Sequence, residues 1–201
     1  MIAQCARDDC QAAAGKIFLS KVHQEKVDNT SVPDKVFLRQ QATKHLKHLK
    51  ILDLYAGENV MWSHFNTDRY YGVEIIKGKG KNLNADCKRV IGSLDLSDFN
   101  VIDCDSYGIP FDVLLKIFEN KTLKRGTTII YVAISNRLSG VNKECLKMFG
   151  LEDMYKKSQV LVAAKAIELF YAMLERQGVE VLYYYKINDN FAKHYGYFIV
   201  D

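Results

Sequence analysis

The sequence predicts an α/β protein built on an open, mostly parallel sheet, with helices on both faces and an antiparallel hairpin at the C-terminus. Three observations support this fold class. Short apolar runs, which are typical of buried strands, alternate with stretches of helical periodicity. Several of these runs end in a carboxylate or in a glycine turn. Two β-rich segments close the chain, at residues 179–187 and 195–200, and a polar turn at residues 188–190 joins them.

The first two thirds of the chain hold most of the expected strands. Ser31 and Pro33 are typical of a helix start, and we expect a basic helix from there to near Leu49. Further helices are expected at residues 60–65 and 111–119. Strands are expected at residues 51–55, 70–75, 82–87, 100–105 and 126–134.

The clearest helical pattern covers residues 157–177. Apolar residues recur there at steps of three and four, and Gly178 follows where a C-terminal stop is expected. The apolar stripe consists of Val160, Ala164, Ile167, Tyr171 and Leu174. This helix would precede the closing hairpin and cover one face of the sheet.

Length and composition indicate a single core. The chain has 201 residues, 48% of them hydrophobic, so we expect an N-terminal extension at residues 1–30 and one domain at residues 31–201. No apolar run approaches the roughly 20 residues that a membrane helix needs. Residues 1–14 lack the apolar centre of a signal peptide, so we expect a cytoplasmic protein. The five cysteines form no CxxC pair and are expected to be reduced and packed, without a metal role.

Carboxylates follow the apolar runs at several points. In an open parallel sheet, ligands bind beyond the carboxyl ends of the strands, near the point where the strand order reverses. The acids there are Asp53, Glu74, Asp86, Asp103 and Asp105. Each could cap a strand end by accepting backbone N–H bonds, but their recurrence favours a polar ligand lying across the crevice.

Residues 53–58 resemble the first motif of class I methyltransferases that depend on S-adenosylmethionine (SAM), in which an apolar strand leads into D-x-x-x-G. The resemblance covers roughly residues 45–201 and implies a Rossmann-like sheet of seven strands with SAM as cofactor. It assigns the turn to the methionine part of the cofactor, through Asp53, Tyr55, Ala56, Gly57 and Glu58. Where the family usually has a second glycine, this chain has Asn59, which adopts left-handed backbone more readily than most residues.

The same resemblance implies roles for the later acids. Glu74 stands about twenty residues after the first motif, where an acid receives the ribose hydroxyls. Asp86, followed by apolar Cys87, is similar to the family's adenine contact, and Asp103 is the next acid in the series.

The segment from Asp103 to Pro110 resembles the D-x-D-P-[FY]-G-S-P stretch of dimethylguanosine tRNA methyltransferases, with Ser106 for the first proline and Ile109 for the serine. Related enzymes methylate exocyclic amines of nucleobases. On this resemblance the catalytic residues are Asp105, which accepts a bond from the target amine, and Tyr107, which stacks on the base. The alternative is that Asp105 caps the next helix and Tyr107 packs against it.

Two segments are rich in basic residues, at residues 35–50 and 77–89, and each could be either a solvated face or a surface for RNA or DNA. Three functions therefore stay open: a methyltransferase acting on a nucleobase, a methyltransferase acting on a small molecule or protein, and a binding protein of the same fold without activity. The basic segments favour the first.

Overall fold

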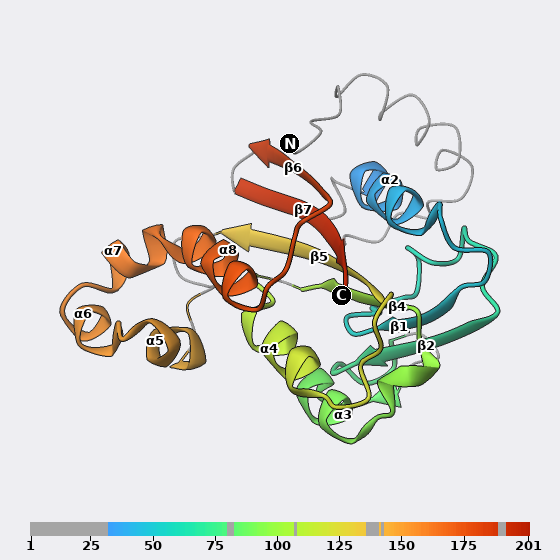
Figure 1. The fold of residues 1–201 in the computed structure, drawn as a ribbon, viewed down its shortest axis with the longest axis horizontal. Coiled ribbons are helices and arrows are strands. Elements are labelled where there is room, and N and C mark those ends of the chain that lie inside the picture. The colour runs from blue at the N-terminus through green and yellow to red at the C-terminus, as the bar shows by residue number, and fades with distance from the viewer. Residues whose placement is uncertain (1–31, 80–82, 107, 136–140, 142, 189–191) are drawn as a thin grey trace.

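The computed structural model describes residues 32–79, 83–106, 108–135, 141, 143–188 and 192–201 (Figure 1). Its strands are β1 (Lys50–Asp53), β2 (Arg69–Glu74), β3 (Leu83–Asn84), β4 (Val101–Asp105), β5 (Thr128–Ser135), β6 (Tyr183–Asn188) and β7 (Ala192–Ile199). They form one sheet in the order β3-β2-β1-β4-β5-β7-β6. The first five are parallel, and β7 runs antiparallel to β5 and to β6. The predicted fold class is confirmed.

Helices cover both faces of this sheet, with α2 (Val32–Thr43) on one face and α3 (Cys87–Ser93), α4 (Phe111–Glu119) and α8 (Ala166–Arg176) on the other (Figure 1). Successive side chains of a strand point to opposite faces. Accordingly Leu52 and Ile102 belong to the core beneath α3, α4 and α8, whereas Ile51 and Val101 belong to the core beneath α2. By this alternation the acids at the ends of β1 and β4 face α2.

The remaining helices are short. The 3₁₀ helix η1 (Leu96–Asp98) leads into β4, and α5 (Lys143–Phe149), α6 (Glu152–Lys157) and α7 (Gln159–Ala164) lie between β5 and α8. No helix in the described part of the chain combines the length and the apolar character needed to cross a membrane.

The N-terminal helix is shorter than predicted, ending at Thr43 rather than near Leu49. The backbone of Leu49 is held by the next segment, because its N–H donates to the Asp68 carboxylate at 2.8 Å and its carbonyl accepts from the Asp68 N–H at 2.9 Å. Asn100 also donates to the His48 carbonyl at 2.7 Å. These contacts, from residues distant in sequence, hold residues 48–49 outside the helix, directly before β1.

The helix predicted at residues 60–65 is wrong, because turns replace it. Asn59, directly before this segment, takes a left-handed conformation with φ 62°, so no helix runs from the glycine turn into residues 60–65. The bonds from Asn59 N–H to the Ala56 carbonyl and from Phe65 N–H to the Trp62 carbonyl close four-residue turns. Trp62 is buried to 3% exposure, which fixes the segment against the sheet.

The helix predicted at residues 157–177 is interrupted. It begins at Gln159 and breaks at Lys165, whose φ of −96° and ψ of 2° end α7 before α8 starts. Val160, assigned to the buried stripe, is 75% exposed, and Val162 is buried in its place. The predicted stop at Gly178 is confirmed, since its φ is 71°.

Three strands differ from their predicted bounds by three residues or more. The third covers only Leu83–Asn84, because Asp86 caps α3 and Cys87 already lies in that helix. The sixth begins at Tyr183 rather than residue 179, and the seventh begins at Ala192 rather than residue 195. The N-terminal extension and residues 189–190 of the predicted turn lie outside the described residues.

Candidate functional site

A cavity of about 220 Å³ opens at the carboxyl ends of the first three strands. Its eight lining residues include Tyr55 after β1, Glu74 at the end of β2, and Asp86 and Cys87 after β3. These four residues, predicted separately as cofactor ligands, are thus brought together although up to 32 positions separate them. We name this cavity the β1–β3 pocket.

The turn after β1 is tied to the end of β2. One oxygen of Glu74 accepts the Gly57 N–H at 3.0 Å, and the other accepts the Ile76 N–H at 2.9 Å. Gly57 has φ 51°, and a side chain placed on it would meet no atom within 4 Å. The glycine therefore serves the left-handed turn and leaves open space beside the backbone, where a ligand can approach.

Asp86 has two roles available to it. Its Oδ1 caps α3 by accepting the Lys88 N–H at 2.8 Å. A carboxylate has about four acceptor positions, so a ligand in the β1–β3 pocket can still bond to it. Asp86 thus accepts a neighbouring backbone N–H, as the alternative to ligand binding expects, and it can still bind a ligand.

A second, smaller cavity of about 100 Å³ adjoins the first, since Tyr55 and Lys88 line both. It extends to Ile109 and Pro110, in the segment that follows β4. Burial raises the pKa of the Tyr55 hydroxyl, which therefore stays neutral between the two cavities. Together the cavities reach the lower end of the range for small-ligand sites, roughly 300–1,000 Å³.

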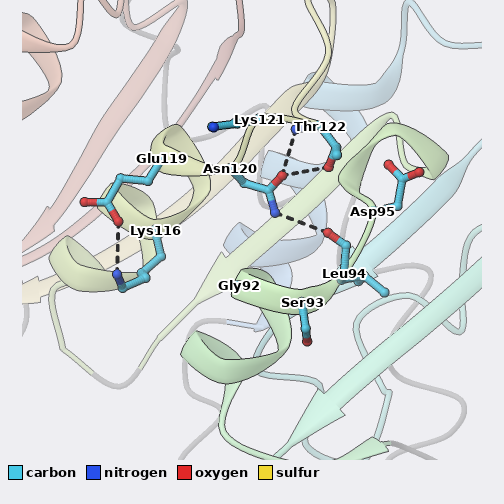
Figure 2. Close-up of a pocket in the computed structure, with 9 residues that line it drawn as sticks. All are labelled: Gly92, Ser93, Leu94, Asp95, Lys116, Glu119, Asn120, Lys121 and Thr122. Carbon is cyan, nitrogen blue, oxygen red and sulfur yellow. Dashed lines mark hydrogen bonds and ion pairs between the residues drawn. The ribbon is translucent and has the colours of Figure 1, made fainter.

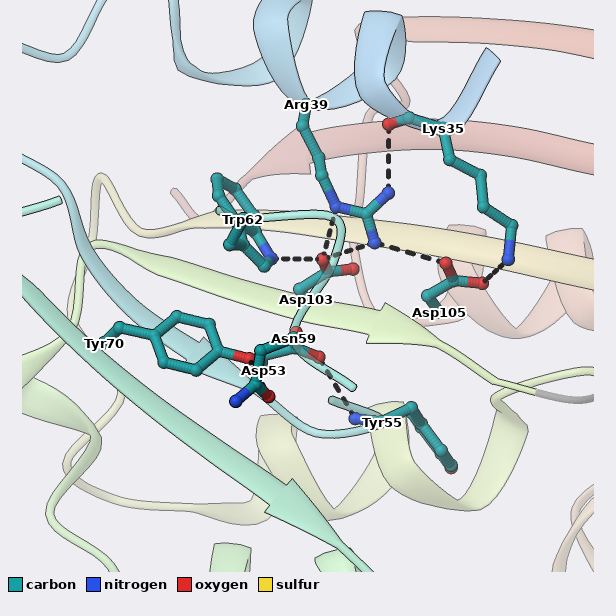
Figure 3. A network of polar contacts seen from close by, with 9 residues as sticks. All are labelled: Lys35, Arg39, Asp53, Tyr55, Asn59, Trp62, Tyr70, Asp103 and Asp105. Carbon is teal, nitrogen blue, oxygen red and sulfur yellow. Dashed lines mark hydrogen bonds and ion pairs between the residues drawn. The ribbon is translucent and has the colours of Figure 1, made fainter. Parts of the chain in front are cut away.

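The acids at the end of β4 lie on the face of the sheet that α2 covers, opposite α3, α4 and α8, and form a cluster with α2 (Figure 3). Arg39 reaches from the helix to Asp103, with Nη2 and Nε at 2.6 and 2.7 Å from the same carboxylate oxygen. Trp62 donates its indole N–H to that oxygen at 2.7 Å. The Arg39 and Asp103 side chains are 1% and 0% exposed, so this ion pair is removed from solvent.

Asp105 is held by two cations from the same helix. Lys35 Nζ lies 2.7 Å from its Oδ1, and Arg39 Nη2 lies 3.2 Å from its Oδ2. Burial alone would raise the pKa of Asp105, but the charges of Lys35 and Arg39 lower it below its usual range. Asp105 is consequently ionised at neutral pH.

Asp53 completes the cluster from β1. Its Oδ1 accepts the Tyr55 N–H at 3.2 Å, and the Tyr70 hydroxyl lies 2.9 Å from its Oδ2. Burial and the charge of Asp103 raise the pKa of Asp53 to about 8. With Asp53 neutral, two carboxylates balance the charges of Lys35 and Arg39.

A neutral Asp53 also accounts for the hydrogen bonds of Tyr70. The single hydroxyl proton of Tyr70 faces two acceptors, Asp53 Oδ2 at 2.9 Å and Asn59 Oδ1 at 3.1 Å. If Asp53 carries the proton, it donates to Tyr70, which then donates to Asn59. These two hydrogen bonds link Asp53, at the end of β1, to Asn59, the left-handed residue of the turn.

The other predicted site residues take different positions. Ala56 is buried, with its N–H bonded to the Val73 carbonyl at 3.1 Å, and Glu58 is exposed. Asp53, Asp103 and Asp105 are not among the residues that line the two cavities. Tyr107 lies outside the described residues.

Sequence reasoning missed Lys35, Arg39, Tyr70 and Trp62 as partners of the acids. The sequence predicts that Lys35 and Arg39 belong to a basic surface segment, but both side chains point into the cluster. A signal was present, because Arg39 falls at helical spacing on the stripe of Val32 and Val36, which are 5% and 0% exposed. A cation on a buried stripe needs an acidic partner.

The largest cavity of those described, about 510 Å³, lies away from this site (Figure 2). It is lined by the C-terminal ends of α3 and α4 and the residues after them, such as Ser93, Glu119 and Asn120. Both helices start beside the two cavities described above, so this one lies at their opposite end. Asn120 joins its walls by donating to the Ile91 and Leu94 carbonyls at 2.6 and 3.2 Å.

No protein-family model matches the chain, and no curated protein sequence matches it. Solved structures do resemble it. Trm1 from Pyrococcus horikoshii, solved with SAM, superposes with a TM-score of 0.55 at 14% identity, covering 88% of this chain and 56% of Trm1. The N-methyltransferase NodS from Bradyrhizobium japonicum gives 0.53 at 8% identity, covering 87% of this chain and 99% of NodS.

The Haemophilus influenzae protein HI0767, described as a candidate methylase, gives a TM-score of 0.53 at 10% identity, covering 84% of this chain and 89% of that one. At these identities the similarity shows the fold. The chain therefore has the Rossmann-like methyltransferase fold.

Proposed function

We propose that this chain binds SAM in the β1–β3 pocket and transfers its methyl group to an exocyclic amine of a nucleobase in RNA or DNA. One observation carries the proposal: Tyr55, Glu74 and Asp86 lie at or just after the ends of three successive strands and line one cavity, and Glu74 also accepts the Gly57 N–H of the turn. The fold is shared with Trm1, which was solved with SAM.

The residues present fit the cofactor. Glu74 already orders the turn through Gly57, and its carboxylate retains acceptor positions for the ribose hydroxyls. Asp86 retains acceptor positions for the adenine amine, beside the apolar wall formed by Leu54 and Cys87. Gly57 gives the backbone access that the methionine part requires. Bound SAM would supply an electrophilic methyl group at the carboxyl edge of the sheet.

The acceptor side of the reaction is assigned to Asp105. Its oxygens each take one bond from a cation, and each keeps a position for the target amine. An ionised carboxylate orients the amine by accepting its N–H, so that the nitrogen lone pair faces the methyl carbon. Tyr107, two residues on, is proposed to stack on the base.

The test of binding uses Glu74→Gln, compared with Glu168→Gln, at an exposed acid of α8 that lines neither cavity. The first substitution replaces an acceptor by a donor facing either Gly57 or Ile76, so it should weaken SAM binding at least tenfold. The second should leave the affinity unchanged. Equal affinities in both variants and the wild type would contradict the assignment of Glu74.

The test of activity is methyl transfer from labelled SAM to pools of RNA, DNA, small molecules and protein. Asp105→Asn should reduce transfer on the order of a hundredfold, and Asp98→Asn, at a surface acid, should not. Transfer to small molecules or protein alone would contradict a nucleobase as the methyl acceptor and would indicate the other methyltransferase function. Binding of SAM without transfer to any pool would make the chain a binding protein.

A further inference from the structure

We propose that helix α2 belongs to the methyl-acceptor site, with Lys35 and Arg39 as positioning residues that fix the orientation and charge of Asp105 (Figure 3). The inference rests on the proposed function and adds to it two residues that do not touch the substrate. They act through Asp105, which they hold from the opposite side of the cluster.

The first argument is geometric. Lys35 and Arg39 are four residues apart and therefore project from one face of α2. Arg39 uses Nε and Nη2 on the acids of β4, while its Nη1 donates to the Lys35 carbonyl at 2.9 Å. The guanidinium is thereby anchored to its own helix and to the strand at once, so Asp105 has little freedom to change its rotamer.

The second argument concerns burial. The Asp105 side chain is 8% exposed, and a carboxylate so removed from water becomes protonated unless it is paired. A protonated Asp105 would have its proton where the amine N–H must bond, so the acceptor function needs its charge. Lys35, with a 19% exposed side chain, supplies the closest cation, at 2.7 Å.

The third argument is that Arg39 is bound to Asp103, one oxygen of which, Oδ2, receives two N–H groups from Arg39 and one from Trp62. Lys35 has Asp105 as its ion-pair partner, with no other acid paired to it among the described residues. Lys35 therefore sets the charge of Asp105, and Arg39 sets its orientation. Substituting Lys35 therefore changes the charge of Asp105 without removing the buried ion pair between Arg39 and Asp103.

The charged groups that face Asp105 define the expected pH dependence. From α2 these are Lys35 and Arg39, from its own strand Asp103, and from β1 Asp53 in the same cluster. Removing Lys35 leaves burial and Asp103 acting against the ionised form. The pKa of Asp105 must then rise, and the acidic limb of the activity profile must move to higher pH.

The experiment compares Lys35→Met, Lys35→Arg and the control Lys121→Met, at an exposed lysine after α4 that lies outside both basic segments. We expect Lys35→Met to lower kcat at least tenfold, to leave the affinity for SAM within twofold, and to shift the acidic limb upward. Lys35→Arg should restore most of the activity, and Lys121→Met should match the wild type.

Arg39→Lys provides a second variant, which keeps the positive charge but loses the guanidinium that bonds to both Asp103 and Asp105. It should reduce kcat while the acidic limb stays in place, because Lys35 is still present. Wild-type kcat in Lys35→Met, or a loss of kcat without any shift of the limb, would overturn the inference while leaving the proposed function intact. An inactive wild type that binds SAM would instead remove the methyl-transfer proposal itself, and with it this inference.

Discussion

Arg39 and Asp103, 64 residues apart in the sequence, form an ion pair of 2.6 Å that is almost fully removed from solvent. The Arg39 guanidinium also lies over the Trp62 ring, 5.6 Å from its centroid. This pair joins α2 to the centre of the sheet. It holds α2 against the face of the sheet that carries the acids of β1 and β4.

Removing this cation should destabilise the protein strongly. Arg39→Met leaves Asp103 buried without its charge partner, for which the usual loss is about 3–5 kcal/mol in the free energy of unfolding. Arg69→Met, at an exposed pair with Asp98, should cost no more than about 1 kcal/mol. Urea denaturation of the two variants measures the difference, and equal losses would contradict the buried role of Arg39.

The proton on Asp53 should be visible in the pH dependence of stability. The folded state binds this proton up to about pH 8, whereas an unfolded aspartate releases it near 3.9. Between these values the native state holds more protons, so the free energy of unfolding falls as pH rises, by up to about 1.4 kcal/mol per pH unit. Above pH 8 the contribution of Asp53 becomes constant.

Asp53→Asn tests this assignment, because its amide reproduces the protonated acid: the oxygen accepts from Tyr55 and the nitrogen donates to Tyr70. The variant should keep its fold and lose the decline between pH 5 and 8, while Asp98→Asn should retain it. Urea denaturation at several pH values measures how the free energy of unfolding changes with pH in each variant. An unchanged slope in Asp53→Asn would mean that Asp53 is already ionised in the native state.

Gly196 of β7 lies opposite Tyr131 of β5, whose ring is fully buried. A methyl group at position 196 would collide with the Tyr131 hydroxyl and ring. Gly196→Ala should therefore cost about 1–3 kcal/mol of stability. Gly92→Ala is the control, since it lies in α3 with nothing within 4 Å and should be neutral or stabilising. Equal melting temperatures for the two variants would contradict the close packing at Gly196.

The two basic segments should differ in their effect on nucleic-acid binding. Lys44 and Lys47 precede β1, at the end of the sheet opposite the pocket, whereas Lys77 and Arg89 are exposed near its carboxyl edge. Charge reversal at Lys77 and Arg89 should weaken RNA or DNA binding and reduce its salt dependence by about one unit of slope per phosphate contact. The matching reversal at Lys44 and Lys47 should do less. Gel-shift assays measure both effects. A larger loss of binding from the reversal at Lys44 and Lys47 would contradict a nucleic-acid surface near the carboxyl edge of the sheet.

The parts of this fold that are encoded locally could be predicted from the sequence. The turn from Asp53 to Gly57, the acid Glu74 and the helix at Phe111–Glu119 all follow from short patterns of apolar, acidic and glycine residues. Asn59 does take the left-handed conformation expected of it. The β1–β3 pocket follows from these strand ends, because parallel strands bring their carboxyl ends to one edge.

Contacts between distant segments could not be predicted in the same way. Whether Lys35 faces water or Asp105 depends on which face of the sheet α2 covers, and no local pattern states this. The same limit explains Val160, which fits a helical stripe but has no core to face. Asp68 and Asn100 end the N-terminal helix early through bonds that span 19 and 52 positions.

The most direct test of the account is calorimetric titration of the wild-type chain with SAM and its demethylated product, beside Ala85→Phe. Ala85 lines the β1–β3 pocket, so a phenylalanine there would fill it without removing a polar contact of Glu74 or Asp86. The account predicts saturable binding of both ligands to the wild type and at least a tenfold loss in Ala85→Phe, with cooperative melting kept. Absence of binding to the wild type, or equal affinity in the two proteins, would contradict it.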